Sequence, residues 1–320
     1  MKVYNQRIYL DILLFFAGLL LLYYGAEYLV SGSSHLALSF GIRPLIIGMT
    51  VVAFATSMPE MMVSLFAAFR DSSDIAAGNI VGSNIANIGL ILGVASMLAP
   101  IVVANKILKR EFPFMVGASL LIYVLILDHK LGFFDGLFQF LLLLVFIGYC
   151  IVNAREDGAG PSVDNGTVDY EKSHRLRDLI FIVVGIVGLG VGAELMVRSS
   201  VSIARSFGVS ELVIGVSIVA LGTSLPELAA SVMSACKGEM DLSIGNVIGS
   251  NIFNILFVLG VCPMVRPLAI EPSLLSYQMP VMLAFSVGLV FLVYRNGGLG
   301  RFQGGVLLSG YAIFIATLFV

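Results

Sequence analysis

Apolar residues in this chain gather into long stretches rather than alternating with polar residues at short spacing. About 20 predominantly apolar residues are enough to span a bilayer as a helix. Ten stretches approach or exceed that length, at roughly 8–30, 44–69, 75–99, 112–127, 132–152, 177–197, 211–236, 242–264, 276–294 and 302–320. The pattern therefore predicts an all-α integral membrane protein with ten transmembrane helices.

The second half of the chain repeats the first. Residues 42–93 align without a gap with residues 209–260 at a constant offset of 167, and 22 of the 52 aligned positions are identical. Repetition at so long a period is typical of a duplicated half-protein rather than of short stacked units. Because five helices is an odd number, the second half must enter the membrane from the opposite side. We therefore predict two inverted five-helix repeats.

The one long polar connection divides the two halves. Residues 1–152 form the predicted first half with repeat 42–93, residues 153–178 a connecting loop, and residues 179–320 the second half with repeat 209–260. If the N-terminus lies outside, the inner loops hold 11 of the 18 Lys and Arg residues. The positive-inside rule then predicts a multi-pass protein of the cell membrane with extracellular termini and a cytoplasmic connecting loop.

Composition supports the same class of protein. Charged residues make up 12% of the chain and apolar residues 58%, with a mean hydropathy of +1.00, whereas soluble domains carry about a quarter charged residues. The net charge of −2 and the lack of a dense basic run give no indication of a nucleic-acid partner. The sequence indicates no cofactor either, and it does not identify a protein partner.

Four glutamates fall within predicted spans. They are Glu27, Glu60, Glu194 and Glu227. An ionisable group at this depth is costly and by default faces a cavity with a function. Glu60 and Glu227 each follow a proline in mid-helix, and proline breaks the backbone ladder, which releases carbonyls such as those of Thr56 and Thr223. For the other two glutamates, a role beside the ion pathway and a structural polar contact both stay open.

Small polar residues extend these positions into stripes. Residues spaced i, i+4 and i+8 share one helix face. The stripes are Thr56, Glu60 and Ser64; Asn79, Ser83 and Asn87; Thr223, Glu227 and Ser231; and Asn246, Ser250 and Asn254. Oxygen-only ligands favour hard cations, and two carboxylates balance one Ca²⁺ or two monovalent ions. The competing interpretation is that these residues, with Gly78-x-x-x-Gly82 and Gly245-x-x-x-Gly249, only pack helices together.

Both repeats carry the same two motifs. Thr-Ser-x-Pro-Glu lies at 56–60 and 223–227, and Gly-Asn-x-x-Gly-Ser-Asn lies at 78–84 and 245–251. On inverted halves, these motifs resemble the alpha-repeats of the cation/Ca²⁺ exchanger superfamily, in particular its prokaryotic Na⁺/Ca²⁺ exchangers. The resemblance implies a secondary active antiporter, not an enzyme, that exchanges Ca²⁺ for Na⁺ by alternating access.

The resemblance also implies roles for individual residues. The implied calcium ligands are the carboxylates of Glu60 and Glu227 and the backbone carbonyls of Thr56 and Thr223. The implied contributors to sodium sites are Ala53, Ser57, Ser83, Ala220, Ser224 and Ser250. Asn87 matches a central polar ligand. Its counterpart Asn254 stands where relatives often carry an aspartate, which leaves the number of sodium ions per calcium open.

Three other functions fit the sequence less well than Na⁺/Ca²⁺ exchange. A Ca²⁺/H⁺ antiporter of the same fold is the nearest, since glutamates also carry protons, although proton-coupled relatives usually show Gly-Asn-x-x-Glu in place of Thr-Ser-x-Pro-Glu. A passive cation channel is disfavoured because an inverted repeat builds no ring around an axis along the membrane normal. A hydrolase using Ser57 or Ser224 is disfavoured because no histidine base lies within a predicted span.

Overall fold

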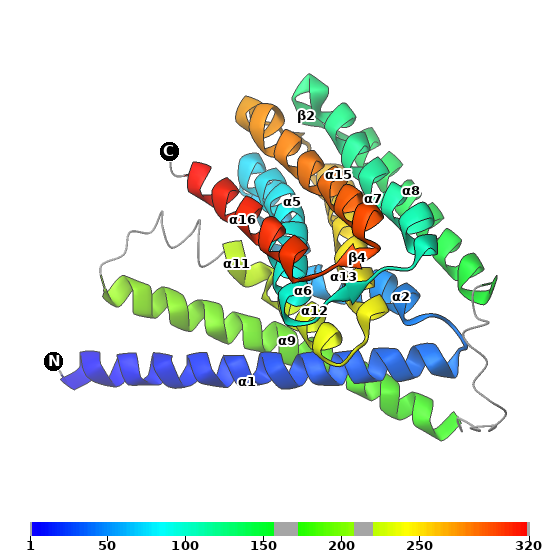
Figure 1. The fold of residues 1–320 in the computed structure, drawn as a ribbon. Coiled ribbons are helices and arrows are strands. Elements are labelled where there is room, and N and C mark those ends of the chain that lie inside the picture. The colour runs from blue at the N-terminus through cyan, green and yellow to red at the C-terminus, as the bar shows by residue number, and fades with distance from the viewer. Residues whose placement is uncertain (1, 157–171, 208–219, 319–320) are drawn as a thin grey trace.

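The computed structural model describes residues 2–156, 172–207 and 220–318, most of which are helical (Figure 1). α1 (Lys2–Ser39) and α9 (Lys172–Ser206) lie side by side along one side of the other helices. Both are longer than predicted, because hydropathy marks only their apolar middle. The 38 residues of α1 span roughly 57 Å at 1.5 Å per residue, well beyond a bilayer core of about 30 Å.

The first half continues with helices that are broken where the repeat motifs lie. The second span consists of α2 (Pro44–Ile47), the π-helical η1 (Gly48–Val52), α3 (Ala53–Thr56) and α4 (Met58–Phe69). The third consists of α5 (Ser73–Ala86), η2 (Asn87–Leu92) and α6 (Gly93–Leu98). α7 (Asn105–Leu125), the short η3 (Ile126–Asp128) and α8 (Phe133–Glu156) complete this half.

The second half follows the same plan. After α9 come α11 (Ala220–Thr223) and α12 (Leu225–Cys236), then α13 (Met240–Phe253), η5 (Asn254–Val258) and α14 (Leu259–Val265). η6 (Leu274–Gln278), α15 (Met279–Asn296) and α16 (Arg301–Thr317) end it. All ten predicted segments therefore coincide with helical structure in the described residues.

Most of these segments are long enough to cross a membrane. Seven described helices pass on length and hydropathy, and the pair 44–56 and 58–69, bent by 42°, makes an eighth. The remaining two segments correspond to the shorter α12 and α16, and α12 follows residues that lie outside the described part. The predicted start at 112 was wrong, since α7 begins at Asn105 and takes in three basic residues that can reach the membrane interface.

The division of the chain at 153–178 stays a prediction. α8 ends at Glu156 and α9 begins at Lys172, so helices extend into this segment from both sides. Residues 157–171 lie outside the described part.

Four two-residue strands reveal the inversion of the halves. β1 (Ile101–Val102) pairs with β4 (Gly298–Leu299), and β2 (Lys130–Leu131) pairs with β3 (Leu268–Ala269), both antiparallel. One spanning helix, α7, separates β1 from β2, so the two sheets lie at opposite ends of the bundle. β3 stands 167 residues after β1 yet belongs to the other sheet. Equivalent positions of the two halves therefore face opposite sides of the membrane.

Residues 167 positions apart touch each other at the centre. The hydroxyls of Ser119 and Ser286 lie 3.4 Å apart, and Nδ2 of Asn84 donates to the backbone carbonyl of Asn251 at 3.4 Å. Only residues beside a two-fold pseudo-axis can meet their own equivalents. The axis therefore runs between α5 and α13 and between α7 and α15.

Glycines bring helices of the two halves into backbone contact. A Cβ added at Gly245 would lie 2.6 Å from the carbonyl oxygen of Leu45, and one at Gly249 would lie 2.6 Å from the Cα of Met49. The helix-packing interpretation is therefore confirmed for this glycine pair. For Gly78 and Gly82, the equivalent partner segment lies in residues outside the described part.

The inversion predicts opposite labelling of two equivalent positions. Ser72 and Glu239 are partly accessible residues at the ends of α4 and α12, so single cysteines there should react with a membrane-impermeant maleimide from opposite sides. The exposed native Cys236 must first be replaced by serine, whereas Cys150 and Cys262 are buried. Labelling of both positions from one side would contradict the inverted arrangement.

Candidate cation-binding site

The second span and its equivalent are both interrupted at a serine. Ser57 separates α3 from α4 with φ −81° and ψ 3°, and Ser224 separates α11 from α12 with φ −88° and ψ 5°. The following prolines, Pro59 and Pro226, lie in the first turn of the second helix, where a missing N–H costs no intrahelical bond. The predicted break is therefore present in both halves.

Each break directs two helix ends at the same place. The carbonyl groups of the last turn of α3 and of α11, those of Thr56 and Thr223 among them, point along the helix axis toward the break. Glu60 and Glu227 lie in the first turns of α4 and α12, where the positive end of the helix dipole favours a carboxylate. Oxygen atoms with negative or partial negative charge therefore gather at both breaks.

The two glutamates are buried together. Each is only 1% exposed, and they interact electrostatically with one another. Ser224 Oγ donates to Glu60 Oε1 at 3.5 Å, while Oε2 of Glu60 and both carboxylate oxygens of Glu227 have no hydrogen-bond partner among the described residues. Three of the four carboxylate oxygens in this pair are thus buried without a donor, which is unfavourable unless a cation or proton compensates.

Neutral oxygens from both halves surround the pair. The hydroxyl groups of Thr223, Ser224 and Ser83 lie near Glu60, and those of Thr56 and Ser57 lie near Glu227 without making a hydrogen bond to it. Each carboxylate is therefore approached by hydroxyl groups at the break of the opposite half. The structure brings these predicted site residues together at the centre of the fold.

The other predicted site residues lie around this centre. Ala53 is fully buried at the start of α3, and Ser250 Oγ lies 3.5 Å from the hydroxyl of Thr56. Asn87 and Asn254 lie one helical turn beyond Ser83 and Ser250 and are buried. Ala220 begins α11, but its surroundings lie outside the described part.

Asn79 and Asn246 have a different role from the one their stripes suggest. Asn79 Nδ2 donates to the backbone carbonyl of Glu60 at 3.3 Å and to Ser64 Oγ at 3.1 Å. Asn246 Nδ2 makes the equivalent bonds to Glu227 and Ser231 at 3.4 Å and 2.9 Å. These amides tie two neighbouring helices together, as the helix-packing interpretation predicts, while Oδ1 of Asn246 also accepts a hydrogen bond from the Thr56 hydroxyl at 3.3 Å and so contacts the site. Shared helical spacing identifies a face but not the neighbour that it meets.

Two buried asparagines of the motif, at 84 and 251, lie beside the predicted site residues but were not predicted to contact them. Asn84 accepts a hydrogen bond from Asn254 Nδ2 at 3.0 Å, and its equivalent Asn251 lies at the same depth. Both occur in the Gly-Ser-Asn segment that identified the repeat. The signal was present in the sequence, but the i, i+4 pattern assigned these two residues to another face.

The donor set suits a hard cation. Every predicted side-chain ligand is a carboxylate, a hydroxyl or an amide, and no group of three or more His, Cys, Asp or Glu side chains occurs in the described residues. Oxygen ligands of this kind select Ca²⁺, Na⁺ and similar ions over transition metals. The unpartnered carboxylate oxygens are consistent with this chemistry.

A cavity of about 240 Å³ reaches the site from one side. Thr56, Met58 and Met62 line it from the first broken helix, Ile186 and Leu189 line it from α9, and Pro226 lines it from α12. The cavity therefore lies beside the breaks of both halves, against α9.

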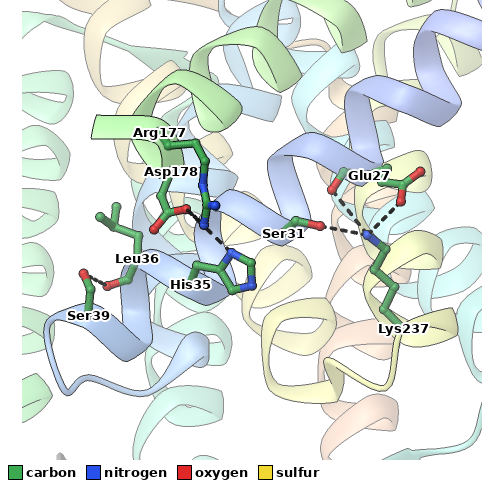
Figure 2. Close-up of polar contacts among 8 residues, drawn as sticks. All are labelled: Glu27, Ser31, His35, Leu36, Ser39, Arg177, Asp178 and Lys237. Carbon is green, nitrogen blue, oxygen red and sulfur yellow. Dashed lines mark hydrogen bonds and ion pairs between the residues drawn. The ribbon is translucent and has the colours of Figure 1, made fainter. Parts of the chain in front are cut away.

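Glu27 lies on α1 and forms an ion pair with a lysine that follows the end of α12. Lys237, just after α12, places Nζ 3.4 Å from Glu27 Oε1 and 2.8 Å from Ser31 Oγ (Figure 2). Glu194 pairs with Arg198 one turn along its own exposed helix face. Both glutamates are partly exposed, unlike the central pair, and these contacts favour the structural interpretation.

A second contact in Figure 2 joins α1 to α9. His35 Nδ1 lies 3.6 Å from Oδ1 of the fully buried Asp178, and Arg177 reaches the same oxygen at 3.5 Å. At the opposite end of the two helices, Ser202 Oγ donates to Asp11 at 2.6 Å. These are equivalent positions of the two halves, so polar pairs fasten α1 to α9 at both ends.

The Glu27 contact should matter little for stability. Glu27→Gln should lower the free energy of unfolding by less than about 1 kcal/mol, because the pair is partly exposed. Asn246→Ala removes buried bonds to three partners and should cost about 2–3 kcal/mol. Thermal unfolding of the purified variants in detergent measures both effects, and equal losses would show that Glu27 makes a buried, structurally essential contact.

Comparison with known proteins agrees with this architecture. The family model "sodium/calcium exchanger protein" matches residues 10–152 and again residues 178–320. The putative antiporter CaxA of Alkalimonas amylolytica is 39% identical over 316 residues, with 94% of this chain and 96% of CaxA covered. The inner membrane protein YrbG of Escherichia coli is 36% identical over 317 residues, with 96% of each chain covered.

A solved structure has the same fold. The sodium-calcium exchanger NCX_Mj, soaked with 10 mM Na⁺ and zero Ca²⁺, superposes with a TM-score of 0.86 at 33% identity, covering 97% of this chain and 99% of that one. With two matched halves and a common fold, the chain belongs to the sodium/calcium exchanger protein family and is a cation antiporter that spans the membrane many times.

Proposed function

We propose that this protein exchanges Ca²⁺ for Na⁺ across the cell membrane, with both termini extracellular, and that Glu60 and Glu227 hold the calcium ion. One observation carries the proposal. The two carboxylates are buried against one another with three of their four oxygens unpartnered, and neutral oxygens from both halves lie around them.

Calcium suits this set of ligands by number and charge. Ca²⁺ takes six to eight oxygens in a flexible arrangement. The two carboxylates offer four oxygens, and the backbone carbonyls of Thr56 and Thr223 offer two more. The pair carries a charge of −2 when ionised, which one Ca²⁺ balances.

Sodium competes for the same carboxylates and uses the neutral oxygens beside them. Ser57, Ser83, Ser224 and Ser250, with the backbone at Ala53 and Ala220, supply these oxygens, and Asn87 and Asn254 lie one turn farther along. Because neither amide carries a charge, two carboxylates balance at most two Na⁺ ions. Ca²⁺ and Na⁺ thus exclude one another, which is what couples their movements in opposite directions.

The inverted halves support alternating access. Two similar halves of opposite orientation can open a shared central site to one side or to the other by exchanging their conformations. A cavity lined by residues of both breaks lies between them and α9. The sodium-calcium exchanger NCX_Mj, which has this fold, carries out exchange of the proposed kind by its name.

A Ca²⁺/H⁺ antiporter is the second candidate. The observation in its favour is the same pair of unpartnered carboxylates, since a proton can neutralise each of them as a cation would. The neutral oxygens around the pair favour sodium as the coupling ion, because sodium needs such ligands and protons do not.

The glutamate pair should be indispensable for transport. Glu60→Gln and Glu227→Gln each remove one of two central charges while keeping the shape of the side chain, so each should reduce ⁴⁵Ca²⁺ uptake into proteoliposomes at least a hundredfold. The matched control is Glu194→Gln, on an exposed helix face, which should transport normally. Near-normal uptake by either central variant would exclude its carboxylate as a required ligand.

The coupling ion can be identified with separately imposed gradients. An opposing Na⁺ gradient at clamped pH should drive ⁴⁵Ca²⁺ uptake, and Ser83→Ala or Ser250→Ala should weaken the apparent Na⁺ affinity more than the Ca²⁺ affinity. Ser119→Ala is a control for the loss of a buried hydroxyl, since Ser119 meets Ser286 rather than the site. Uptake that ignores Na⁺ and follows a pH gradient would assign the protein to the proton-coupled antiporters.

A further inference from the structure

Four buried asparagines, at 84, 87, 251 and 254, lie beside the pseudo-axis, and they are not hydrogen-bonded alike. Asn84 and Asn251 are equivalent positions of the two halves, and so are Asn87 and Asn254. The proposed function assigns ligand roles to Asn87 and Asn254 but none to Asn84. The hydrogen bonds around Asn84 indicate a role for this residue as well.

The orientation of the Asn84 amide follows from a backbone carbonyl. The carbonyl oxygen of Asn251 can only accept a hydrogen bond, so the side chain that faces it at 3.4 Å must present Nδ2. The sulfur of Met282 lies 3.7 Å from the same nitrogen and is also an acceptor. Oδ1 of Asn84 is therefore turned the other way, toward Asn254.

This orientation fixes the next amide in turn. Asn254 donates Nδ2 to Asn84 Oδ1 at 3.0 Å, which directs its own Oδ1 away from Asn84 within the planar amide group. Asn254 is fully buried, and its Oδ1 has no hydrogen-bond partner among the described residues. It lies one helical turn beyond Ser250, whose hydroxyl contacts Thr56 at the break.

The equivalent bond is missing in the other half. Asn251 donates Nδ2 to the carbonyl of Val247 on its own helix at 2.9 Å, so it does not orient Asn87. Both polar atoms of the Asn87 side chain lack a partner among the described residues. One central amide is thus held in a single orientation, and its equivalent is not.

We infer that Asn84 is a positioning residue that fixes the side-chain oxygen of Asn254 toward the cation site, so that Asn254 serves as a neutral-oxygen ligand for the monovalent ion. An amide that rotates would present N–H groups to the cation in half of its orientations, which opposes binding. Calcium draws most of its binding energy from the two carboxylates, whereas sodium depends on neutral oxygens. Loss of the Asn84 contact therefore weakens sodium binding selectively.

The inference rests on the proposed function and is tested with the full chain in proteoliposomes. Asn84→Leu removes the acceptor for Asn254 while filling the same space. The Na⁺ concentration that half-inhibits ⁴⁵Ca²⁺ uptake should rise about five- to tenfold, as expected for the loss of one hydrogen bond. The KM for Ca²⁺ without Na⁺ should change less than twofold.

Asn251→Leu is the matched control, because Asn251 is equally buried and holds the equivalent position, but its side chain bonds only its own helix and the substitution keeps the backbone carbonyl that Asn84 contacts. It should leave the response to Na⁺ within twofold of the unaltered protein. In an Asn254→Asp background the donor to Asn84 is absent, so adding Asn84→Leu should then change the Na⁺ response less than twofold.

The outcomes separate the two proposals. An unaltered protein whose uptake ignores Na⁺ overturns the sodium assignment and this inference with it. An unaltered protein that responds to Na⁺, together with an unchanged response in Asn84→Leu, overturns the inference alone. Equal losses in Asn84→Leu and Asn251→Leu, or equal losses for Na⁺ and Ca²⁺, would show that Asn84 serves only the packing of the helices.

Discussion

A carboxylate that leaves water for the interior of a membrane protein loses several kcal/mol of hydration, unless hydrogen bonds, a counter-charge or a proton replace it. Glu60 and Glu227 are buried side by side, and three of their four carboxylate oxygens have no hydrogen-bond partner among the described residues. The other groups at the centre of the fold are arranged around these unpartnered carboxylate oxygens. Broken helices turn carbonyl and hydroxyl oxygens toward the pair, which is the arrangement that the proposed cation site requires.

The same constraint explains why the helices break where they do. An unbroken helix satisfies its own carbonyls and offers a cation only side chains. Ser57 and Ser224 end one helix and begin another within a single residue, so carbonyl ends and carboxylate-bearing first turns face the same space. Asn79 and Asn246 each donate a hydrogen bond to the backbone carbonyl of the glutamate, which holds the second helix of the break against its neighbour. The ligands are therefore positioned by hydrogen bonds that lie outside the ligand set.

The sequence predicted the number and type of the helices and the interruption at both Pro-Glu pairs, because hydropathy and the missing proline N–H are local properties. It also predicted the inversion, from an odd helix count. It could not predict the length of α1 and α9, since buried serines such as Ser33 and Ser34 lower the hydropathy of turns that are nevertheless helical. Nor could it separate Asn79 from Asn87, because a shared face says nothing about which helix packs against it.

The inverted repeat also bears on the direction of exchange. Turning the molecule over about its pseudo-axis places each half close to where the other was, so an ion arriving from either side meets nearly the same ligands in nearly the same order. A carrier of this form has little intrinsic preference for one direction of transport, and the gradients of the exchanged cations decide which way the exchange runs. Any residual preference must come from positions where the halves differ, such as the contact of Glu27 with Lys237 at one end and that of Glu194 with Arg198 at the other.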